Sequence, residues 1–180
     1  DPVLWWSPDP RAILQVENFK PSKSLRKIIR NGHFQVTFDQ AFSAVIAACA
    51  EPRSSSTETW ITPNMQQAYI ALHELELGHS VECWQEGELV GGLYGVSLGT
   101  MFFGESMFSK VSNASKVALA ELIDRLNRWG FTLLDCQIMS PHLASLGAID
   151  MPRNQFLSLL LENRRSTTRT GRWELPVEYT

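Results

Sequence analysis

An apolar run over residues 131–137, Phe-Thr-Leu-Leu-Asp-Cys-Gln, constrains the fold of this chain more than any other segment. A run of this kind predicts a buried strand, yet this one ends in a carboxylate and an amide. Because side chains alternate between the two faces of a strand, Asp135 and Gln137 are expected on one face and Cys136 on the other. The fold must therefore bring a carboxylate and an amide to one point of a core sheet.

A second run, residues 101–108, also predicts a core strand and is interrupted by Glu105. Two acids and an amide on neighbouring core strands favour a functional site. The alternative is that each acid only caps a strand end or pairs with an arginine, and for one acid alone that alternative is the stronger. Three such groups together point to function.

The composition is that of an ordinary globular protein. With 180 residues and 44% hydrophobic content, the chain can bury a sizeable core as one large domain or as one domain with an appendage. No apolar run approaches the roughly 20 residues that cross a bilayer, and no basic-then-apolar leader opens the chain, so we expect a cytoplasmic protein without a membrane partner. Because the chain begins at Asp1 without methionine, the natural N-terminus is expected to lie upstream.

The cysteines and histidines do not predict a metal site. Cys49, Cys83 and Cys136 are scattered through apolar segments and fit reduced core residues better than a disulfide set or a zinc site. His73-Glu74 resembles the start of a zinc-protease motif, but that motif needs its second histidine at position 77, which is leucine. We therefore expect no bound metal.

Basic residues gather in one early segment. The net charge is −3, yet Lys20, Lys23, Arg26, Lys27 and Arg30 fall within eleven residues that contain no acid. Such clusters are mostly solvated faces, but this one has the composition of a local contact for phosphates. The acidic net charge argues against a general nucleic-acid-binding protein and leaves open a protein that touches one particular RNA.

Local patterns predict the order of the elements. Residues 1–35 are rich in proline and aromatic side chains and are expected to form a small irregular subdomain, with 36–180 as the main domain. Thr62-Pro63 supplies an N-cap and a first-turn proline for a helix over 63–78, and Asp39 is expected to cap an earlier helix that ends near residue 50. The other expected elements are a strand at 36–38, a Ser/Thr-rich loop at 51–58, a hairpin at 80–96, a strand at 100–107, a helix at 113–129, and short helices at 141–146 and 152–163.

Helix, three-strand meander, helix, strand and short helix follow one another in the order of the acyl-transferase fold of the Gcn5-related N-acetyltransferases. We therefore expect an α+β protein with a mixed sheet flanked by helices and a small N-terminal subdomain. Those enzymes hold the pyrophosphate of acetyl-CoA on a glycine-rich turn before the central helix, and the corresponding turn here, residues 108–116, has no glycine. The scaffold is expected to work without acetyl-CoA; the alternative, an acetyltransferase, would bind it.

Eight short motifs stand in register between residue 3 and about residue 160: Trp-Trp-Ser-Pro-Asp-Pro-Arg, Thr-Trp-Ile-Thr-Pro, His-Glu-Leu-Glu-Leu-Gly-His-Ser-Val-Glu, Gly-Gly-Leu-Tyr-Gly-Val, Phe-Gly-Glu-Ser-Met-Phe-Ser, Asn-Ala-Ser-Lys, Asp-Cys-Gln and Ala-Ser-Leu-Gly-Ala. Together they resemble the bacterial leucyl/phenylalanyl-tRNA-protein transferase family. The resemblance implies that leucine or phenylalanine, with methionine as a further candidate, moves from aminoacyl-tRNA to the N-terminal Arg or Lys of a protein and marks it for degradation. It implies that the partners are leucyl-tRNA, phenylalanyl-tRNA and proteins that begin with Arg or Lys. It also implies that the protein is a monomer and needs no cofactor, because aminoacyl-tRNA is a substrate.

The chemistry of such a transfer fits the polar residues. Asp135 is the candidate base or proton acceptor for the attacking amine, whose ordinary pKa near ~8 demands only modest help, and Gln137 is the orienting amide. Glu105, in the matched Gly-Glu-Ser-Met-Phe motif, would hold the aminoacyl-adenosine end or the incoming amine. Since the ester is already reactive, positioning is expected to supply most of the rate.

Recognition of the aminoacyl-tRNA requires an apolar pocket and a platform for the terminal adenine. For Trp60, the candidate platform, the alternative is a buried structural tryptophan, and for each pocket residue it is an ordinary core position. The substrate-binding candidates are Trp60, Leu93, Phe102, Gly104, Met107, Leu119, Leu122 and Leu134. The tRNA-binding candidates, which share one side of a short predicted helix, are Lys23, Arg26, Lys27 and Arg30.

The resemblance leaves two points open. A non-catalytic module that binds tRNA or basic N-termini on the same scaffold is the alternative function, and the joint presence of Asp135 and Gln137 argues against it. The family also carries an upstream Phe-Pro-Trp-Phe-like segment near the adenosine site, and this chain begins just after it. The N-terminal subdomain is therefore expected to be incomplete at its start, with one adenine contact missing.

Overall fold

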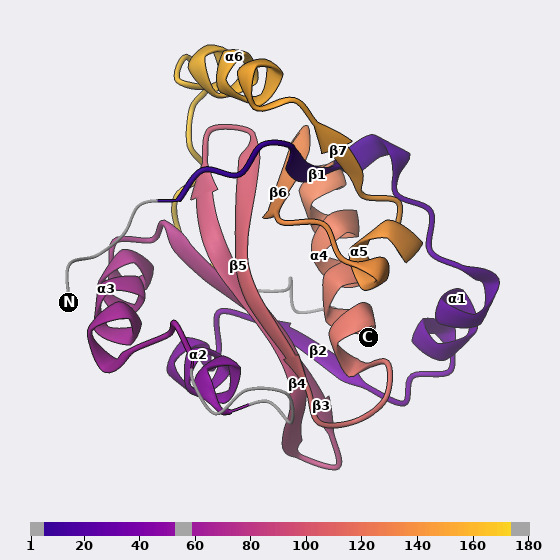
Figure 1. Cartoon of the computed structure of the whole chain (residues 1–180). Coiled ribbons are helices and arrows are strands. Elements are labelled where there is room, and N and C mark those ends of the chain that lie inside the picture. Colours follow the sequence, from indigo (N-terminus) through magenta and orange to yellow (C-terminus); the bar gives the residue numbers. More distant parts are fainter. Residues whose placement is uncertain (1–5, 53–58, 174–180) are drawn as a thin grey trace.

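The computed structural model describes residues 6–52 and 59–173 and shows a seven-stranded sheet with helices on both faces (Figure 1). The strand order is β2-β3-β4-β5-β6-β1-β7, and neighbours run antiparallel except β5 and β6, which are parallel. The sheet is mixed, and the expected α+β class is confirmed. The strands are β1 (Arg11–Gln15), β2 (Gln35–Phe38), β3 (Gly78–Gln85), β4 (Glu88–Leu98), β5 (Met101–Ser109), β6 (Leu133–Gln137) and β7 (Ile149–Met151). The helices are α1 (Lys23–Arg30), α2 (Phe42–Ala50), α3 (Pro63–Glu74), α4 (Ala114–Arg128), α5 (Pro141–Ser145) and α6 (Arg153–Asn163), with a 3₁₀ turn at Val16–Asn18.

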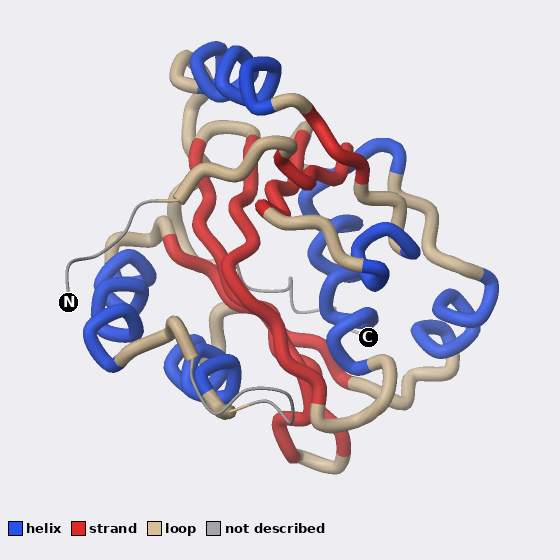
Figure 2. Tube along the Cα trace, viewed as in Figure 1, coloured by secondary structure: helices blue, strands red, loops and turns tan. Residues whose placement is uncertain are grey.

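Helices α2 and α3 cover one face of the sheet, and α4, α1 and α5 lie on the other (Figures 1 and 2). The larger core lies between the sheet and α4, where Val117, Leu122 and Leu126 are buried. A second core, which includes Phe42 and Ile46, lies under α2 and α3. Burial of these apolar faces is the main force that holds both helical layers on the sheet.

Local sequence signals explain where the helices begin and end. α3 begins where Thr62 Oγ1 accepts a hydrogen bond from the Met65 N–H at 3.3 Å, and α1 begins where Ser22 Oγ accepts one from the Leu25 N–H at 3.2 Å. α4 ends before Gly130, whose φ of +75° a glycine adopts without strain. These local signals fix the starts of α1 and α3 and the end of α4.

The element order expected of the acyl-transferase fold is confirmed, since α3, the meander β3-β4-β5, α4, β6 and α5 follow one another. Two details of the prediction are wrong. α3 ends at Glu74, because Glu76 has a φ of +61° and the chain then enters β3. α2 begins at Phe42, and Asp39 does not cap it; its carboxylate accepts hydrogen bonds from the backbone N–H groups of Ser80 and Trp173 instead.

The sequence patterns also do not predict β1, which lies between β6 and β7 in the sheet. Residues 11–15 are thus part of the main sheet, while the division into 1–35 and 36–180 stays a prediction. Trp5 of the first motif and residues 53–58 of the expected loop lie outside the described residues. Among the described residues, no helix has the length and apolar character needed to cross a membrane.

The two parallel strands pair over only a short stretch. Their register ends at the pair Phe103 and Asp135, although both strands continue beyond it. On its other side β6 pairs with β1, and that register shifts at a bulge between Ala12 and Ile13. β5 and β6 therefore part toward their carboxyl ends and open the sheet near its middle.

Candidate functional site

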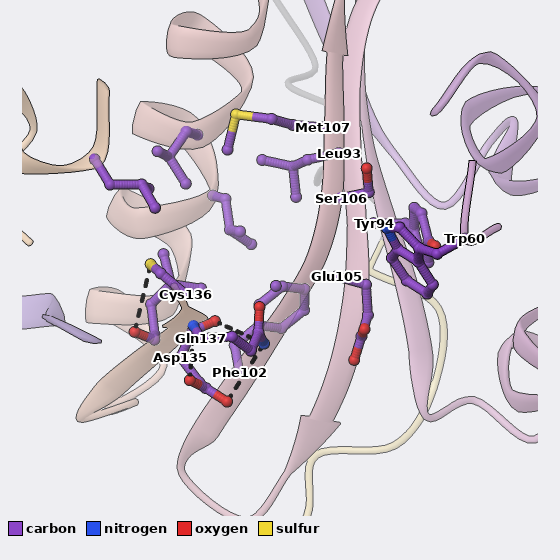
Figure 3. A pocket seen from close by; sticks show the side chains of 15 residues that line it. Trp60, Leu93, Tyr94, Phe102, Glu105, Ser106, Met107, Asp135, Cys136 and Gln137 are labelled. Carbon is purple, nitrogen blue, oxygen red and sulfur yellow. Dashed lines mark hydrogen bonds between the residues drawn. The ribbon is translucent and has the colours of Figure 1, made fainter. Parts of the chain in front are cut away.

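A cavity of about 250 Å³ lies where β5 and β6 part (Figure 3). Its walls come from β4, β5, β6, α4, α5 and the loop before α3. The structure brings together there all the predicted catalytic and substrate-binding residues: Glu105, Asp135, Gln137, Trp60, Leu93, Phe102, Gly104, Met107, Leu119, Leu122 and Leu134. Sequence reasoning did not select four other lining residues, Tyr94, Ser106, Cys136 and Leu143. The roles of all these residues stay predictions.

One end of the cavity is apolar. Leu119 and Leu122 from α4 line it together with Leu93 and Leu134 from the sheet, and each of the four is at most 3% exposed. Figure 3 shows Met107 and Leu93 at this end, away from Glu105, Asp135 and Gln137. The flexible thioether of Met107 can adapt to side chains of different shape. This end can take up an apolar side chain without offering it a charged partner.

Asp135 is a fully buried carboxylate that pairs with Arg11. Arg11 Nε donates to Oδ1 at 2.9 Å and Arg11 Nη2 donates to Oδ2 at 2.6 Å. The alternative considered for a single acid, pairing with an arginine, therefore describes Asp135. Because Asp135 also lines the cavity, this ion pair fixes a side chain of the site.

Gln137 ends β6 with a φ of +58° and turns back to Asp135. Its backbone N–H donates to Asp135 Oδ1 at 3.1 Å, and its Nε2 donates to Oδ2 at 3.4 Å. The two side chains meet, as their expected place on one strand face predicts, and Cys136 between them packs against the main core and also lines the cavity. The result is a carboxylate and an amide that face the cavity as one unit.

Glu105 lines the cavity from β5 and belongs to a second polar pair. The Tyr69 hydroxyl of α3 forms a hydrogen bond to its carboxyl group. Burial raises the pKa of Glu105 and the nearby Asp135 charge raises it further, whereas the Tyr69 bond and Arg11 act in the other direction. A carboxyl group whose pKa is raised beside a cavity can exchange a proton closer to neutral pH than an ordinary glutamate.

Trp60 lies at the edge of the cavity with 52% of its surface exposed. The alternative of a buried structural tryptophan is therefore wrong. Tyr94, which also lines the cavity, is fully buried, and its hydroxyl has no hydrogen-bond partner among the described residues. An exposed aromatic ring at a cavity edge can stack on a flat ligand.

The four tRNA-binding candidates lie on α1, outside the cavity. Lys23, Arg26, Lys27 and Arg30 are all exposed, and none forms a salt bridge within the part of the chain that the structure describes. The opposite side of α1 packs on the main core through the buried Leu25. The helix therefore presents a basic face to solvent, as expected from its spacing.

Sequence reasoning missed Arg11, Tyr69 and Tyr94 as site residues. Arg11 closes the first motif, but nothing near it in the sequence shows that its partner stands 124 residues away. Tyr69 and Tyr94 lie in regular helix and strand patterns that fit ordinary core positions equally well. Across residues 6–52 and 59–173, no group of three or more His, Cys, Asp or Glu side chains is placed to hold a metal ion.

Known proteins match this chain over most of its length. The family model described as "Leucyl/phenylalanyl-tRNA protein transferase" matches residues 13–161. A protein of Azotobacter vinelandii named leucyl/phenylalanyl-tRNA–protein transferase is 56% identical over 162 residues, 90% of this chain and 72% of that protein. A solved structure of a conserved protein of unknown function from Bacteroides thetaiotaomicron is 11% identical, covers 90% of this chain and 57% of that one, and has a TM-score of 0.50. A GCN5-related N-acetyltransferase from Kribbella flavida is 12% identical, covers 81% of this chain and 55% of that one, and has a TM-score of 0.48.

Proposed function

Since the chain belongs to the leucyl/phenylalanyl-tRNA protein transferase family, we propose that it moves leucine or phenylalanine, with methionine as a further substrate, from aminoacyl-tRNA to the N-terminal Arg or Lys of acceptor proteins. The protein is an aminoacyltransferase, as its relatives are named. That name favours an enzyme over a non-catalytic module that only binds tRNA or basic N-termini. The acceptor is thereby marked for degradation.

The observation that carries the proposal is the two-ended cavity between β5 and β6. Its apolar end, with Leu119 and Leu122, receives the side chain of the transferred amino acid. Its polar end, with Glu105 and the Asp135–Gln137 unit, receives the ester and the incoming amine. Trp60 at the edge stacks on the terminal adenine, so the substrate lies across the opening of the sheet.

The reaction needs little chemistry from the protein. The acceptor nitrogen attacks the ester carbonyl, the new C–N bond replaces the C–O bond to the tRNA ribose, and the proton that leaves the nitrogen ends on the ribose oxygen. Gln137 orients the amine, and Glu105 holds the aminoacyl-adenosine end or the amine itself. Holding both reactants at the parted strands supplies most of the acceleration, because proximity alone can lower such barriers substantially.

The basic face of α1 binds tRNA phosphates from leucyl-tRNA and phenylalanyl-tRNA. Replacing Lys23, Arg26, Lys27 and Arg30 together by alanine should flatten the slope of log affinity against log salt by somewhat under one unit for each lost phosphate contact. The control replaces the exposed Arg164 and Arg165. An unchanged slope in the quadruple variant would show that tRNA docks elsewhere.

In this proposal the protein acts as a monomer in the cytoplasm and does not use acetyl-CoA. At the start of α4 the Ser115 N–H already donates to Ser109 Oγ at 3.2 Å and the Ala114 N–H to the Val111 carbonyl at 3.2 Å, so these two donors are engaged within the turn before the helix. No cofactor is required, because the aminoacyl ester of the tRNA brings the activated group.

The test is transfer of labelled phenylalanine from charged tRNA to a protein that begins with Arg, with the same protein beginning with Ala as the control. Label on the Arg acceptor alone supports the proposal. Binding of charged tRNA without transfer would replace it by the binding module. Tight binding of acetyl-CoA, measured by calorimetry, would replace it by an acetyltransferase.

A further inference from the structure

Phe102 of β5 lines the cavity with a ring that is fully buried. It belongs to the larger core together with Leu119, Leu122 and Leu134, which line the apolar end. The backbone of β4 lies against the ring, since a Cβ atom at Gly95 would stand 2.5 Å from Phe102 Cε1 and 2.7 Å from its Cζ. The ring therefore occupies the space that a side chain at residue 95 would take, and it has no room to move toward β4.

Trp173 packs against Phe102 but does not itself line the cavity. The two ring centroids are 5.5 Å apart, and the ring planes are tilted by 41°. The Trp173 side chain is among the largest that are fully buried in this protein. Because protein interiors leave few voids, a movement of Phe102 away from a ligand would have to displace this indole.

Trp173 is held in place from several directions. Its backbone N–H donates to Asp39 Oδ2 at 2.8 Å, and its indole stacks on the His79 ring with the two planes 7° from parallel. Trp129 and Phe131 contact the indole edge-on, with centroids 5.0 Å and 6.0 Å away. The indole is thus a fixed support for Phe102.

Residues 164–173, which follow α6 and are here called the strap, carry this indole into the core. Thr168 Oγ1 accepts a hydrogen bond from the Gly99 N–H at 2.9 Å, at the turn between β4 and β5. The guanidinium group of Arg169 lies over the Trp129 ring, with Cζ 4.0 Å from the centroid. The strap is therefore attached to the sheet and to the end of α4 before it reaches the core.

We propose that Trp173 is a positioning residue for substrate selection: by supporting Phe102 it fixes the width of the cavity and limits the transferred amino acid to side chains of the size of leucine, methionine and phenylalanine. This inference rests on the proposed function. Trp173 does not touch the substrate and acts through Phe102. An apolar pocket excludes a larger side chain, such as that of tryptophan, only through the space that it offers, so a wall that cannot move away improves the discrimination.

Trp173→Phe tests the support with little other change. Trp173 Nε1 has no hydrogen-bond partner among the described residues, so the variant loses volume without losing a side-chain hydrogen bond to them. Phe102 can then move away from the cavity, which admits an indole and which a leucine side chain fills less completely. The ratio of kcat/KM for a tryptophanyl ester to that for a leucyl ester should rise about 10-fold, while kcat/KM for the phenylalanyl ester should change by less than about threefold.

The experiment measures transfer to an acceptor that begins with Arg from the adenosine esters of leucine, phenylalanine and tryptophan, which differ only in the amino-acid side chain. Phe38→Leu is the matched control, because Phe38 is a buried ring of the same core but lies on β2, at the edge of the sheet, and does not line the cavity. It should lower the thermal midpoint and keep the wild-type ratio of tryptophanyl to leucyl transfer. A loss of folded protein lowers transfer from all three esters equally, so this ratio separates substrate selection from stability.

An unchanged ratio in Trp173→Phe would overturn the inference. An equal rise of the ratio in Phe38→Leu would also overturn it, since a general loosening of the core would then explain the result. If Trp173→Phe does not fold, Trp129→Leu, which removes one contact of the indole, should raise the ratio about threefold, and an unchanged ratio there would decide against the inference.

Calorimetry with unreactive amide analogues of the three esters separates this inference from the proposed function. Absence of transfer by the wild type would overturn the proposed function. The ratio of the affinities for the tryptophanyl and leucyl analogues would still test the support of Phe102, because binding of the side chain does not require the transfer step. A rise of that ratio in Trp173→Phe supports the inference, and an unchanged ratio overturns it.

Discussion

Two buried aspartates show how differently this chain uses the same chemical group. Asp39 accepts backbone hydrogen bonds from Ser80 at 2.9 Å and Trp173 at 2.8 Å, and its carboxylate also lies 2.9 Å from His79 Nδ1 and 3.9 Å from His73 Nδ1. The Asp135 side chain is 0% exposed and that of Asp39 is 1% exposed, but Asp135 lines the cavity and Asp39 does not. A buried acid whose oxygens all accept hydrogen bonds is therefore not in itself evidence of catalysis. The cavity beside Asp135 is what distinguishes it from Asp39.

The Asp39 cluster joins segments that are distant in sequence. Its partners lie on β3 and at Trp173, whose indole stacks on the His79 ring with centroids 3.8 Å apart. Burial opposes the charge on Asp39, but His79 and the two backbone N–H groups outweigh it and lower the pKa of the carboxyl group. Asp39 is thus a structural acid, and Asp135 is the acid of the site.

The largest effect should come from removing the structural acid. Asp39→Ala leaves His79 and two buried backbone N–H groups without their acceptor, so the free energy of unfolding should fall by about 3 to 5 kcal/mol. The kcat of the remaining folded protein should not change. Denaturant unfolding together with active-site titration measures both quantities, and a loss of kcat at unchanged stability would break the comparison.

The next effect should come from the site. Gln137→Ala removes the amide that is hydrogen-bonded to Asp135, and should lower kcat by about 100-fold while the free energy of unfolding changes by less than about 1 kcal/mol. Affinity for tRNA should stay the same, because the amide lies far from the basic face of α1. Gln155→Ala, an exposed glutamine on α6, is the control, and equal kcat values for the two variants would remove Gln137 from the site.

Two tryptophans sharpen the same contrast. Trp60→Ala should weaken the binding of charged tRNA by about 1 to 3 kcal/mol because the stacking is lost, with the free energy of unfolding nearly unchanged. Trp173→Ala, which removes a side chain that is 1% exposed, should instead cost about 3 to 5 kcal/mol of stability and leave tRNA affinity intact. Fluorescence titration with charged tRNA and thermal unfolding separate the two; if Trp60→Ala lost stability and kept affinity, Trp60 would belong to the fold.

The fold was predictable where the signals are local. Thr62 and Pro63 cap α3, Gly130 ends α4, and the turn at Glu86-Gly87 joins β3 to β4, all within a few residues of expectation. The place of β1 was not, because it depends on pairing with β6, more than a hundred positions along the chain. Asp39 looked like a helix cap for the same reason, since its actual partner at Trp173 is 134 residues away.

The site shows the same division. The resemblance to the family selected residues such as Glu105 and Leu119, and the structure brings them to one cavity, although their roles stay predictions. The family and the enzyme class are confirmed by the matches. Arg11 and Tyr69 could not be predicted as site residues, because each contacts the site through one partner that is distant in sequence. Neither the periodicity nor the spacing of the sequence indicates such a contact.

The smallest effect should be a pH dependence of stability at the Asp39 cluster. His73 Nδ1 donates to the Gly78 carbonyl at 2.7 Å and its ring stacks on Phe42, and burial followed by the Arg172 charge lowers the pKa of the ring. A lowered pKa means that the unfolded chain takes up the proton first, so stability should be full above the ordinary value of about 6.5 and decline as the pH falls through it.

The thermal midpoint should therefore be a few degrees lower at about pH 5.5 than at about pH 7.5. In His73→Gln this decrease should be smaller than in the wild type. Burial also lowers the pKa of His142, so His142→Gln, measured in parallel, assigns its share. Glu105 cannot cause the decline, because a raised carboxyl pKa makes the folded state gain stability as the pH falls. If both histidine variants kept the full decrease in thermal midpoint, the pH dependence of stability would not arise at the Asp39 cluster. The two buried acids would then not differ in how their surroundings respond to pH.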